Sequence, residues 1–349
     1  MFLSEDPVLK AVPYDLKSGS IGPSFPVLNE VLRAHWGGGG SYSESPNGTM
    51  VYVRGSLLRR SDLGWYNRDG TLIEQLAIGT NSEWGLDLNK TGTRALTGIP
   101  NYRNDDIYII DNGGTTQVTS HPSSEGWSIW SPDGNSIAYQ RDFESGGNLV
   151  LIQSLESGAQ PKEIYRSDYP AYPRSWTPDG NWILIAEGSD ESNLNILAIN
   201  VTDPQNILRI AETPNREWDP QISPDGNWLA YDYEEGSKTV TNITSFPDPG
   251  VRTRLIDGSY NVRWTQSTNE IFYWWNNVLM VSAYETVPRF SVISTDSLFS
   301  IQDDTQDWWK EYDVSPDGQR ILLKTQNESE KIKEVQVVLN FFELLRDSN

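Results

Sequence analysis

The 349-residue chain has no cysteine and only two histidines, His35 and His121. Because there is no thiol, cysteine-based nucleophilic catalysis is excluded, and cysteine usage gives no indication of the redox compartment. Two histidines are too few for a three-histidine zinc site or a copper cluster. Each lies in a predicted loop, where a histidine is usually solvated, so no catalytic residue is assigned.

Long apolar runs and basic residues are also scarce. No stretch of about 18 apolar residues and no signal peptide is found, so direct membrane insertion is not expected. The chain has no Gly-x-Ser-x-Gly motif, no kinase glycine-rich loop and no His-Arg-Asp motif. It holds 27 Lys and Arg against 48 Asp and Glu, for a net charge of -21. That excess argues against nucleic acid or an anionic membrane surface as a partner.

What the chain does contain is a repeated turn. A Ser/Thr-Pro-Asp-Gly tetrapeptide occurs at residues 131–134, 177–180, 223–226 and 315–318. Degenerate versions at 45–48, 88–92 and 264–269 fill the remaining positions of the series. The proline-equivalent residues are then 46, 90, 132, 178, 224, 266 and 316, with gaps of 42 to 50 residues. This is the period of a β-propeller blade.

Each repeat predicts four short strands. In one repeat the turn is followed by β-rich runs at Trp182 to Ile185, Leu194 to Ile199 and Ile207 to Ile210, and another run leads into the turn. Gly, Pro, Asn and Asp separate the runs, which is the hairpin signature. We therefore predict an all-β protein, a β-propeller of four-stranded antiparallel blades. Seven blades are favoured, with six or eight left open.

The two ends indicate how the ring closes. Val8 to Asp15 matches the third strand at Val278 to Glu285, and Val335 to Phe342 is a third strand with no fourth after it. We predict a single domain over 1–349, with closing strands in 1–30, six blades in 31–300 and a C-terminal blade in 301–349. Pairing of N- and C-terminal strands would cover both edges. One strand is left over, so either the closing blade has an extra strand or an earlier half-blade is missing.

The residues before each first strand are expected to line one mouth of the central channel. Rings beside guanidinium and carboxylate groups there could bind sugars, peptides or an extended partner segment. Alternatively, the rings pack between neighbouring blades. Trp36, Trp308 and Trp309 break the common spacing and are expected to be exposed. The candidate ligand-binding residues are Trp36, Trp84, Trp127, Tyr172, Arg174, Trp218, Tyr260, Arg263, Trp308 and Trp309.

The repeats with Ser-Pro-Asp-Gly turns resemble the TolB-like propellers, whose WD40-like repeats are of the Pro-Asp type. The tail, Tyr312 to Gly318 with Val337 to Leu345, resembles the C-terminal end of propellers fused to bacterial membrane serine/threonine kinases. The stretch Ser245 to Gly250 is of the same kind, as is Leu9 to Leu16 followed by Phe25 to Leu28. The resemblance covers nearly the whole chain. It implies a sensor or interaction module outside the cytoplasm, in the periplasm or at the cell surface.

We therefore expect a non-catalytic, monomeric propeller that binds a protein, a small molecule or an oligosaccharide, without a cofactor. Calcium in the channel or loops is left open, although acidic pairs such as Asp105-Asp106 lack the spacing of a calcium loop. We also expect a kinase or a membrane anchor in the parent gene or beside it. The alternative is a carbohydrate-active enzyme that acts at the channel mouth, as some polysaccharide lyases with TolB-like propellers do. It would require His35 and His121 to share a metal at one rim.

Overall fold

The computed structural model describes residues 2–3, 8–29, 31, 41–54, 61–80, 85–100, 104–143, 146–189, 193–301, 311–326, 334–343 and 345. The chain forms two compact units. We call Asp62–Thr325 the propeller unit, and Met1–Ser61 with Gln326–Asn349 the terminal unit. Throughout the described ranges, the secondary structure is β apart from one 3-10 turn at Phe341–Glu343. No helix there has the length and apolar character needed to span a membrane.

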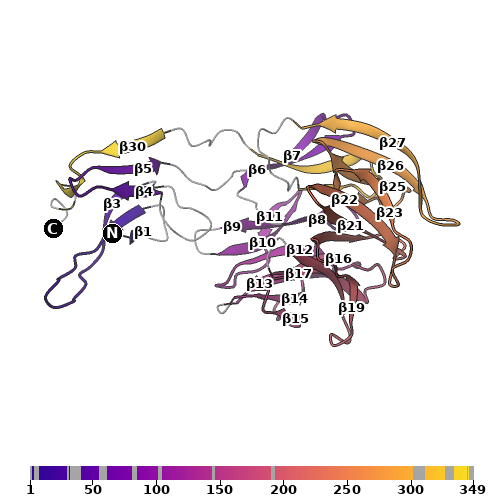
Figure 1. Ribbon diagram of the computed structural model, residues 1–349, viewed down its shortest axis with the longest axis horizontal. Coiled ribbons are helices and arrows are strands. Elements are labelled where there is room, and N and C mark those ends of the chain that lie inside the picture. Colours follow the sequence, from indigo (N-terminus) through magenta and orange to yellow (C-terminus); the bar gives the residue numbers. More distant parts are fainter. Residues whose placement is uncertain are drawn as a thin grey trace. The chain divides into compact units, whose positions relative to one another are not determined.

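The propeller unit consists of antiparallel four-stranded sheets, and six are present among the described residues (Figure 1). Blades 1 to 3 are β8 (Leu86–Leu88), β9 (Ala95–Pro100), β10 (Asp105–Asp111) and β11 (Gly114–Gln117); β12 (Glu125–Trp130), β13 (Ser136–Asp142), β14 (Asn148–Ser154) and β15 (Lys162–Ser167); and β16 (Ala171–Trp176), β17 (Trp182–Gly188), β18 (Leu194–Asn200) and β19 (Ile207–Ala211).

Blades 4 to 6 follow the same order. They are β20 (Glu217–Ile222), β21 (Trp228–Glu235), β22 (Lys238–Ser245) and β23 (Thr253–Asp257); β24 (Ser259–Trp264), β25 (Glu270–Trp275), β26 (Val278–Glu285) and β27 (Ser291–Ser300); and β28 (Tyr312–Val314), β29 (Arg320–Gln326), β6 (Ser61–Asn67) and β7 (Leu72–Thr80). The first strands β8, β12, β16, β20, β24 and β28 contact one another in sequence, and β28 contacts β8. These six inner strands therefore form a closed ring.

The all-β propeller and its closure by N- and C-terminal strands are confirmed, since β28 and β29 share blade 6 with β6 and β7. The described residues form six four-stranded sheets in the propeller unit and two three-stranded sheets in the terminal unit, which is within the range of six to eight that the sequence allowed. The strands assigned to closure in residues 1–30 pair with each other instead, and the strand at Met50–Arg54 pairs with Glu334–Val338. They do so because they bury a separate apolar core, described below.

Local turn chemistry explains the spacing of the strands. In the turn after β16, the Thr177 hydroxyl donates a hydrogen bond to Asp179 at 2.5 Å, and the same carboxylate accepts from the Asn181 amide at 3.0 Å. Gly180 has φ +78°, a conformation that costs glycine little. Such a turn reverses the chain without help from distant residues, so the hairpin between first and second strands can be read directly from sequence.

Apolar side chains between successive sheets hold the blades together. Ile129 and Val150 of blade 2 pack in one cluster with Ile183 and Leu197 of blade 3. At the closure, Trp65 of blade 6 is in one cluster with residues of blade 1. Each fully buried side chain of this size stabilises the fold by about 1.5–3 kcal/mol. The inner strands are therefore held in place from both sides, which fixes the residues that line the centre.

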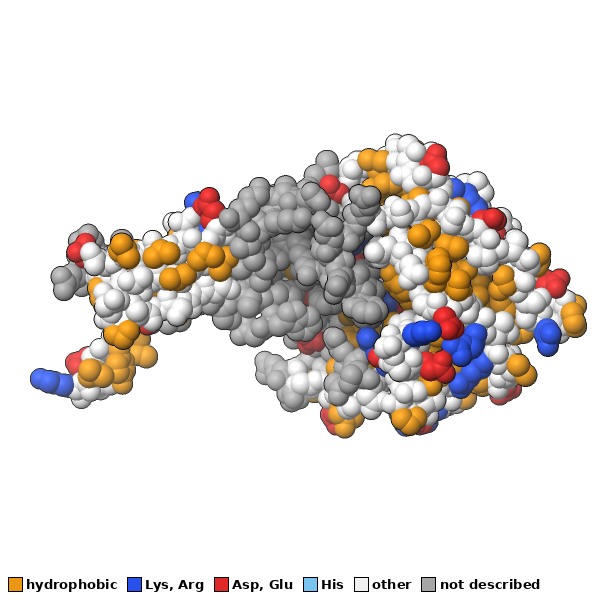
Figure 2. Space-filling view, turned by 45° about the horizontal axis from the view of Figure 1, so that its top comes forward, with side chains coloured by type: hydrophobic (Ala, Val, Ile, Leu, Met, Phe, Trp, Pro, Cys, Tyr) orange, Lys and Arg blue, Asp and Glu red, His pale blue; other side chains and the backbone are white. Residues whose placement is uncertain are grey.

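The terminal unit contains two three-stranded sheets. One has the order β1 (Phe2–Leu3), β2 (Val8–Ala11), β3 (Phe25–Asn29), and the other β30 (Glu334–Val338), β5 (Met50–Arg54), β4 (Tyr42–Glu44). Leu9, Val31, Met50 and Phe341 form a buried core between them. The other face of the second sheet carries exposed valines, and Figure 2 shows hydrophobic side chains on the surface of this unit.

Candidate functional site

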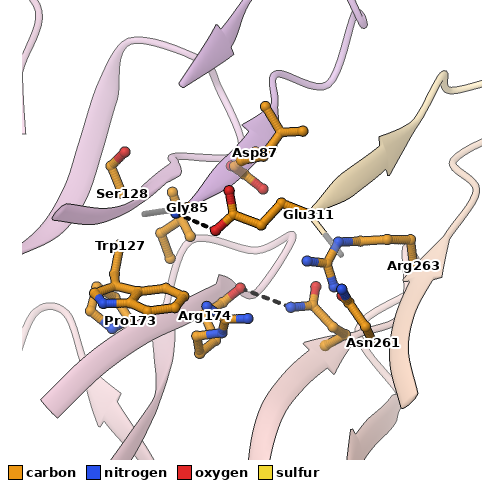
Figure 3. A pocket seen from close by; sticks show the side chains of 12 residues that line it. Gly85, Asp87, Trp127, Ser128, Pro173, Arg174, Asn261, Arg263 and Glu311 are labelled. Atoms are coloured by element: carbon orange, nitrogen blue, oxygen red, sulfur yellow. Dashed lines mark hydrogen bonds between the residues drawn. The ribbon is translucent and has the colours of Figure 1, made fainter. Parts of the chain in front are cut away.

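A cavity of about 30 Å³ lies among the inner strands of the propeller unit (Figure 3). Its size leaves room for two or three water molecules, at roughly 10–15 Å³ for each. It is therefore a small hollow among the inner strands. The residues that line it are Gly85, Leu86, Asp87, Trp127, Ser128, Ile129, Pro173, Arg174, Gln221, Asn261, Arg263 and Glu311.

The same position of each repeat contributes a residue to this site or its immediate surroundings. The residues five before each proline-equivalent position are Gly85, Trp127, Pro173, Asp219, Asn261 and Glu311, one from each blade. The inner strands β12, β16, β20 and β24 all change register here, as a β-bulge does. A bulge redirects side chains, so successive blades aim the same position at the centre.

The backbone at this position is unusual. Trp127, Asp219 and Asn261 have φ of +50°, +49° and +58°, and Gly85 has +80°. Positive φ is rare for residues other than glycine and is a true outlier for a bulky one. It costs on the order of 1–3 kcal/mol per residue and persists only where the surroundings impose it. At Gly85 a side chain would also be crowded, because a Cβ would lie 3.2 Å from the Cα of Trp127.

Two arginines and one aspartate form a buried ionic network beside the cavity. Arg174 of β16 donates from Nε to Asp219 Oδ1 at 2.9 Å, and Arg263 of β24 donates from Nη1 to Oδ2 at 3.1 Å. Burial alone would raise the pKa of Asp219, but the two guanidinium groups hold it below the ordinary value. The ionised carboxylate thus joins three consecutive blades.

Other aspartates accept backbone hydrogen bonds from the next blade. Asp313 of blade 6 accepts from the Leu88 amide at 2.7 Å, and Asp87 of blade 1 accepts from the Trp130 amide at 2.7 Å. Burial, together with the charge of Asp313, raises the pKa of Asp87 to about 7. Burial also raises the pKa of Asp313. These carboxyls link neighbouring inner strands and charge less readily than exposed ones.

Glu311 reinforces the same seam between blades 6 and 1. Its carboxylate accepts from the Gly85 amide at 2.8 Å and from Lys324 at 2.6 Å. The side chains of Glu311 and Lys324 are only 12% and 11% exposed. In Figure 3 Glu311 extends across the cavity toward Gly85. The cavity is therefore lined by fixed, paired charges on this side.

Aromatic rings gather on the other side. The ring centroids of Trp127 and Tyr172 are 5.3 Å apart, and the guanidinium carbon of Arg174 lies 4.6 Å from the Trp127 ring. In blade 4, Arg216 covers the Trp218 ring at 4.5 Å. Cation–π contacts of this kind help to hold the rings in place.

The structure places the sequence-predicted residues as follows. Trp127, Arg174 and Arg263 line the cavity, Tyr172 contacts Trp127, and Trp218 is half-buried beneath Arg216. Tyr260 packs against the core cluster between blades 5 and 6, which fits the packing alternative. The predictions for Trp36, Trp84, Trp308 and Trp309 lie outside the described residues.

Sequence reasoning missed Asp87, Gln221, Asn261 and Asp313 as parts of the site. It looked for aromatic rings, which stand six residues before several of the motifs, and the bulges turn the next position inward instead. Polar residues that stand three or five positions before the proline-equivalent residue would have pointed to all four.

One of the two histidines lies in the described part of the chain. His121 accepts a hydrogen bond from the Ser123 amide at Nδ1, 3.0 Å away, and His35 lies outside the described ranges. No three His, Asp or Glu side chains within those ranges are arranged to hold a metal ion. The enzyme alternative, which requires both histidines at one rim, therefore stays a prediction. Calcium binding in the channel or loops also stays a prediction.

Comparisons with known proteins agree with the architecture. No family model and no curated protein sequence matches the chain. Among solved structures, a putative TolB from Agrobacterium tumefaciens superposes with a TM-score of 0.60 at 16% identity, over 77% of this chain and 99% of that one. TolB from Acinetobacter baumannii gives 0.53 at 16% identity, over 82% and 68%. A chain of a nidogen/laminin complex gives 0.51 at 10% identity, over 80% and 99%. The fold is therefore that of a TolB-like β-propeller.

Proposed function

We propose that the propeller unit is a non-catalytic binding module, which holds a protein partner at the rim of its central cavity. The observation that carries this proposal is that Trp127, Tyr172, Arg174 and Arg263 come together there from three blades. Trp, Tyr and Arg are the residue types that dominate binding hot spots.

The size of the cavity favours a protein over a buried sugar. Small-molecule sites usually enclose about 300–1,000 Å³, whereas this cavity measures about 30 Å³. A ligand therefore rests on the rim and inserts at most a small group. An extended segment of a partner can do this while stacking on Trp127 and Tyr172. The similar chain from the nidogen/laminin complex belongs, by that description, to an assembly of two proteins.

Charge favours a basic partner segment. Of the net charge of -21, the propeller unit carries -20, because the terminal unit has nine Lys and Arg against ten Asp and Glu. An acidic surface of this strength raises the encounter rate of positively charged partners and repels acidic ones.

We further infer, from the sequence resemblance of the two ends, that the propeller is a sensor or interaction module of the type fused to bacterial serine/threonine kinases. Such a module would lie outside the cytoplasm. A gene for a kinase or a membrane anchor next to, or continuous with, this one would support the assignment. A genomic neighbourhood with neither would count against it.

The binding proposal is tested with a panel of basic, neutral and acidic extended peptides and neutral oligosaccharides, by calorimetry on the full chain. We expect binding of basic peptides that weakens with salt. Tyr172→Ala should reduce affinity by roughly 10-fold or more, the loss of about 1.4 kcal/mol that defines a modest hot spot. Tyr14→Ala is the matched control, since Tyr14 is 60% exposed and lies in the terminal unit. Equal effects of both substitutions, or binding of sugars alone, would refute the proposal.

A further inference from the structure

The second sheet of the terminal unit has an apolar face on each side. Met50, Tyr52 and Val338 belong to the buried core cluster. The register pairs Val335 with Val53 and Val337 with Val51. Because directly opposed residues point to the same side of a sheet, these four valines share the opposite face. We call Val51, Val53, Val335 and Val337 the valine face.

The valine face is open in the described structure. Val335 is 60% exposed, Val337 58% and Val51 38%, and Leu339 just beyond β30 is 71% exposed. A half-solvated antiparallel sheet normally shows polar side chains on its outer face. Four clustered valines that pair across strands are instead the pattern of a face that packs against another layer.

Net charge favours contact between two copies through the terminal unit over contact through the propeller unit. The propeller unit carries -20, so two copies that approached through it would repel each other strongly. The terminal unit carries only -1, and the valine face itself is uncharged. It is the part of the chain through which two copies can meet at little electrostatic cost.

We propose that the valine face is a homodimer interface, at which two copies of this chain pack sheet against sheet about a two-fold axis. A sheet face is complementary in shape to a like face at a layer spacing of about 10 Å. Since the same residues serve on both copies, the contact is isologous and closes at two subunits. This interface is independent of the binding rim in the propeller unit.

The size of the face predicts a weak dimer. Three strands of up to five residues span roughly 17 by 14 Å. That supplies only part of the roughly 800 Å² per partner of a standard interface. Association should therefore depend on concentration, with the chain passing from monomer to dimer over an accessible range. Because the contact is apolar, added salt should not weaken it.

Sedimentation velocity of the full chain over a concentration series tests the proposal. We expect the mass to rise from 39.4 kDa toward twice that value. Val337→Lys should weaken association by at least about tenfold, since a buried unpaired charge costs several kcal/mol. Val251→Lys is the matched control, because Val251 is 86% exposed but lies in the propeller unit. Val335→Thr with Val337→Thr keeps the β-branched shape, so a loss of dimer in that variant cannot be ascribed to unfolding of the strand.

Several results would overturn the assignment. A mass of one chain at every concentration removes the dimer. A dimer that withstands Val337→Lys places the interface elsewhere, and growth beyond two copies contradicts a closed two-fold contact. Cosedimentation of the monomer with neutral phosphatidylcholine vesicles, lost in Val337→Lys, would assign the face to a lipid surface instead.

Discussion

Asp232 offers a direct test of how the centre of the propeller is built. It lies on β21, is 1% exposed, and accepts hydrogen bonds from the Asn261 amide and the Thr241 hydroxyl, both at 2.8 Å. Burial, together with the charge of Asp219, raises the pKa of Asp232 to about 8 from 3.8. The folded protein therefore holds Asp232 protonated at neutral pH, while the unfolded chain ionises it.

The sign of the effect follows from proton linkage. Between pH 4 and 8 the unfolded chain binds fewer protons at this residue than the folded protein, so its contribution to stability falls as pH rises. Each pH unit in that window costs about 1.4 kcal/mol. Asp232→Asn keeps the shape but cannot ionise: its side-chain oxygen can still accept from the Asn261 amide, and its NH2 group can donate to the Thr241 hydroxyl. Relative to the unsubstituted chain, the variant should therefore gain on the order of 3 kcal/mol between pH 5 and pH 7.

Urea unfolding at pH 5 and pH 7 measures this difference. Thirteen of the 14 tryptophans lie in the propeller unit, so their fluorescence reports on that unit. Asp296→Asn, on the exposed outer strand β27, is the control and should follow the unsubstituted chain at both pH values. The reasoning is refuted if Asp232→Asn changes the free energy of unfolding equally at pH 5 and pH 7, because Asp232 would then be ionised in the folded protein.

Two further substitutions test the packing and the ionic network. Gly92→Ala should lower the free energy of unfolding in urea by about 2–3 kcal/mol, because φ is +67° and the new Cβ would lie 2.6 Å from Pro316 of the neighbouring turn. Gly180→Ala is the control: φ is +78° but the surroundings are open, so the loss should be only about 1 kcal/mol. Equal costs would show that the two turns do not pack together. Asp219→Asn should lower the free energy of unfolding by about 3–5 kcal/mol, because it leaves two buried arginines without their carboxylate. Glu235→Gln removes an exposed ion pair and should lower it by at most about 1 kcal/mol. A small effect at Asp219 would mean that the arginines find other partners.

The sequence by itself determined the repeat, the strand order within a blade and the all-β class. Turns such as Thr177 to Asn181 form through bonds within five residues, so their chemistry can be read without the rest of the chain. The aromatic and arginine residues near the rim followed from the same periodicity. Trp127, Arg174 and Arg263 line the cavity because they lie on inner strands, and the repeat predicts that these strands converge.

Only the tertiary structure decided which strands close the ring and which further polar side chains, beyond the predicted arginines, lie at the centre. Pairing of β29 with β6 joins segments far apart in sequence, and it competes with other strands of nearly equal β-propensity, including β5 and β30. Burial of Met50 and Phe341 in a separate core settles that competition. The bulges that turn Asp219 and Asn261 inward depend on contacts with neighbouring blades, which local sequence does not encode.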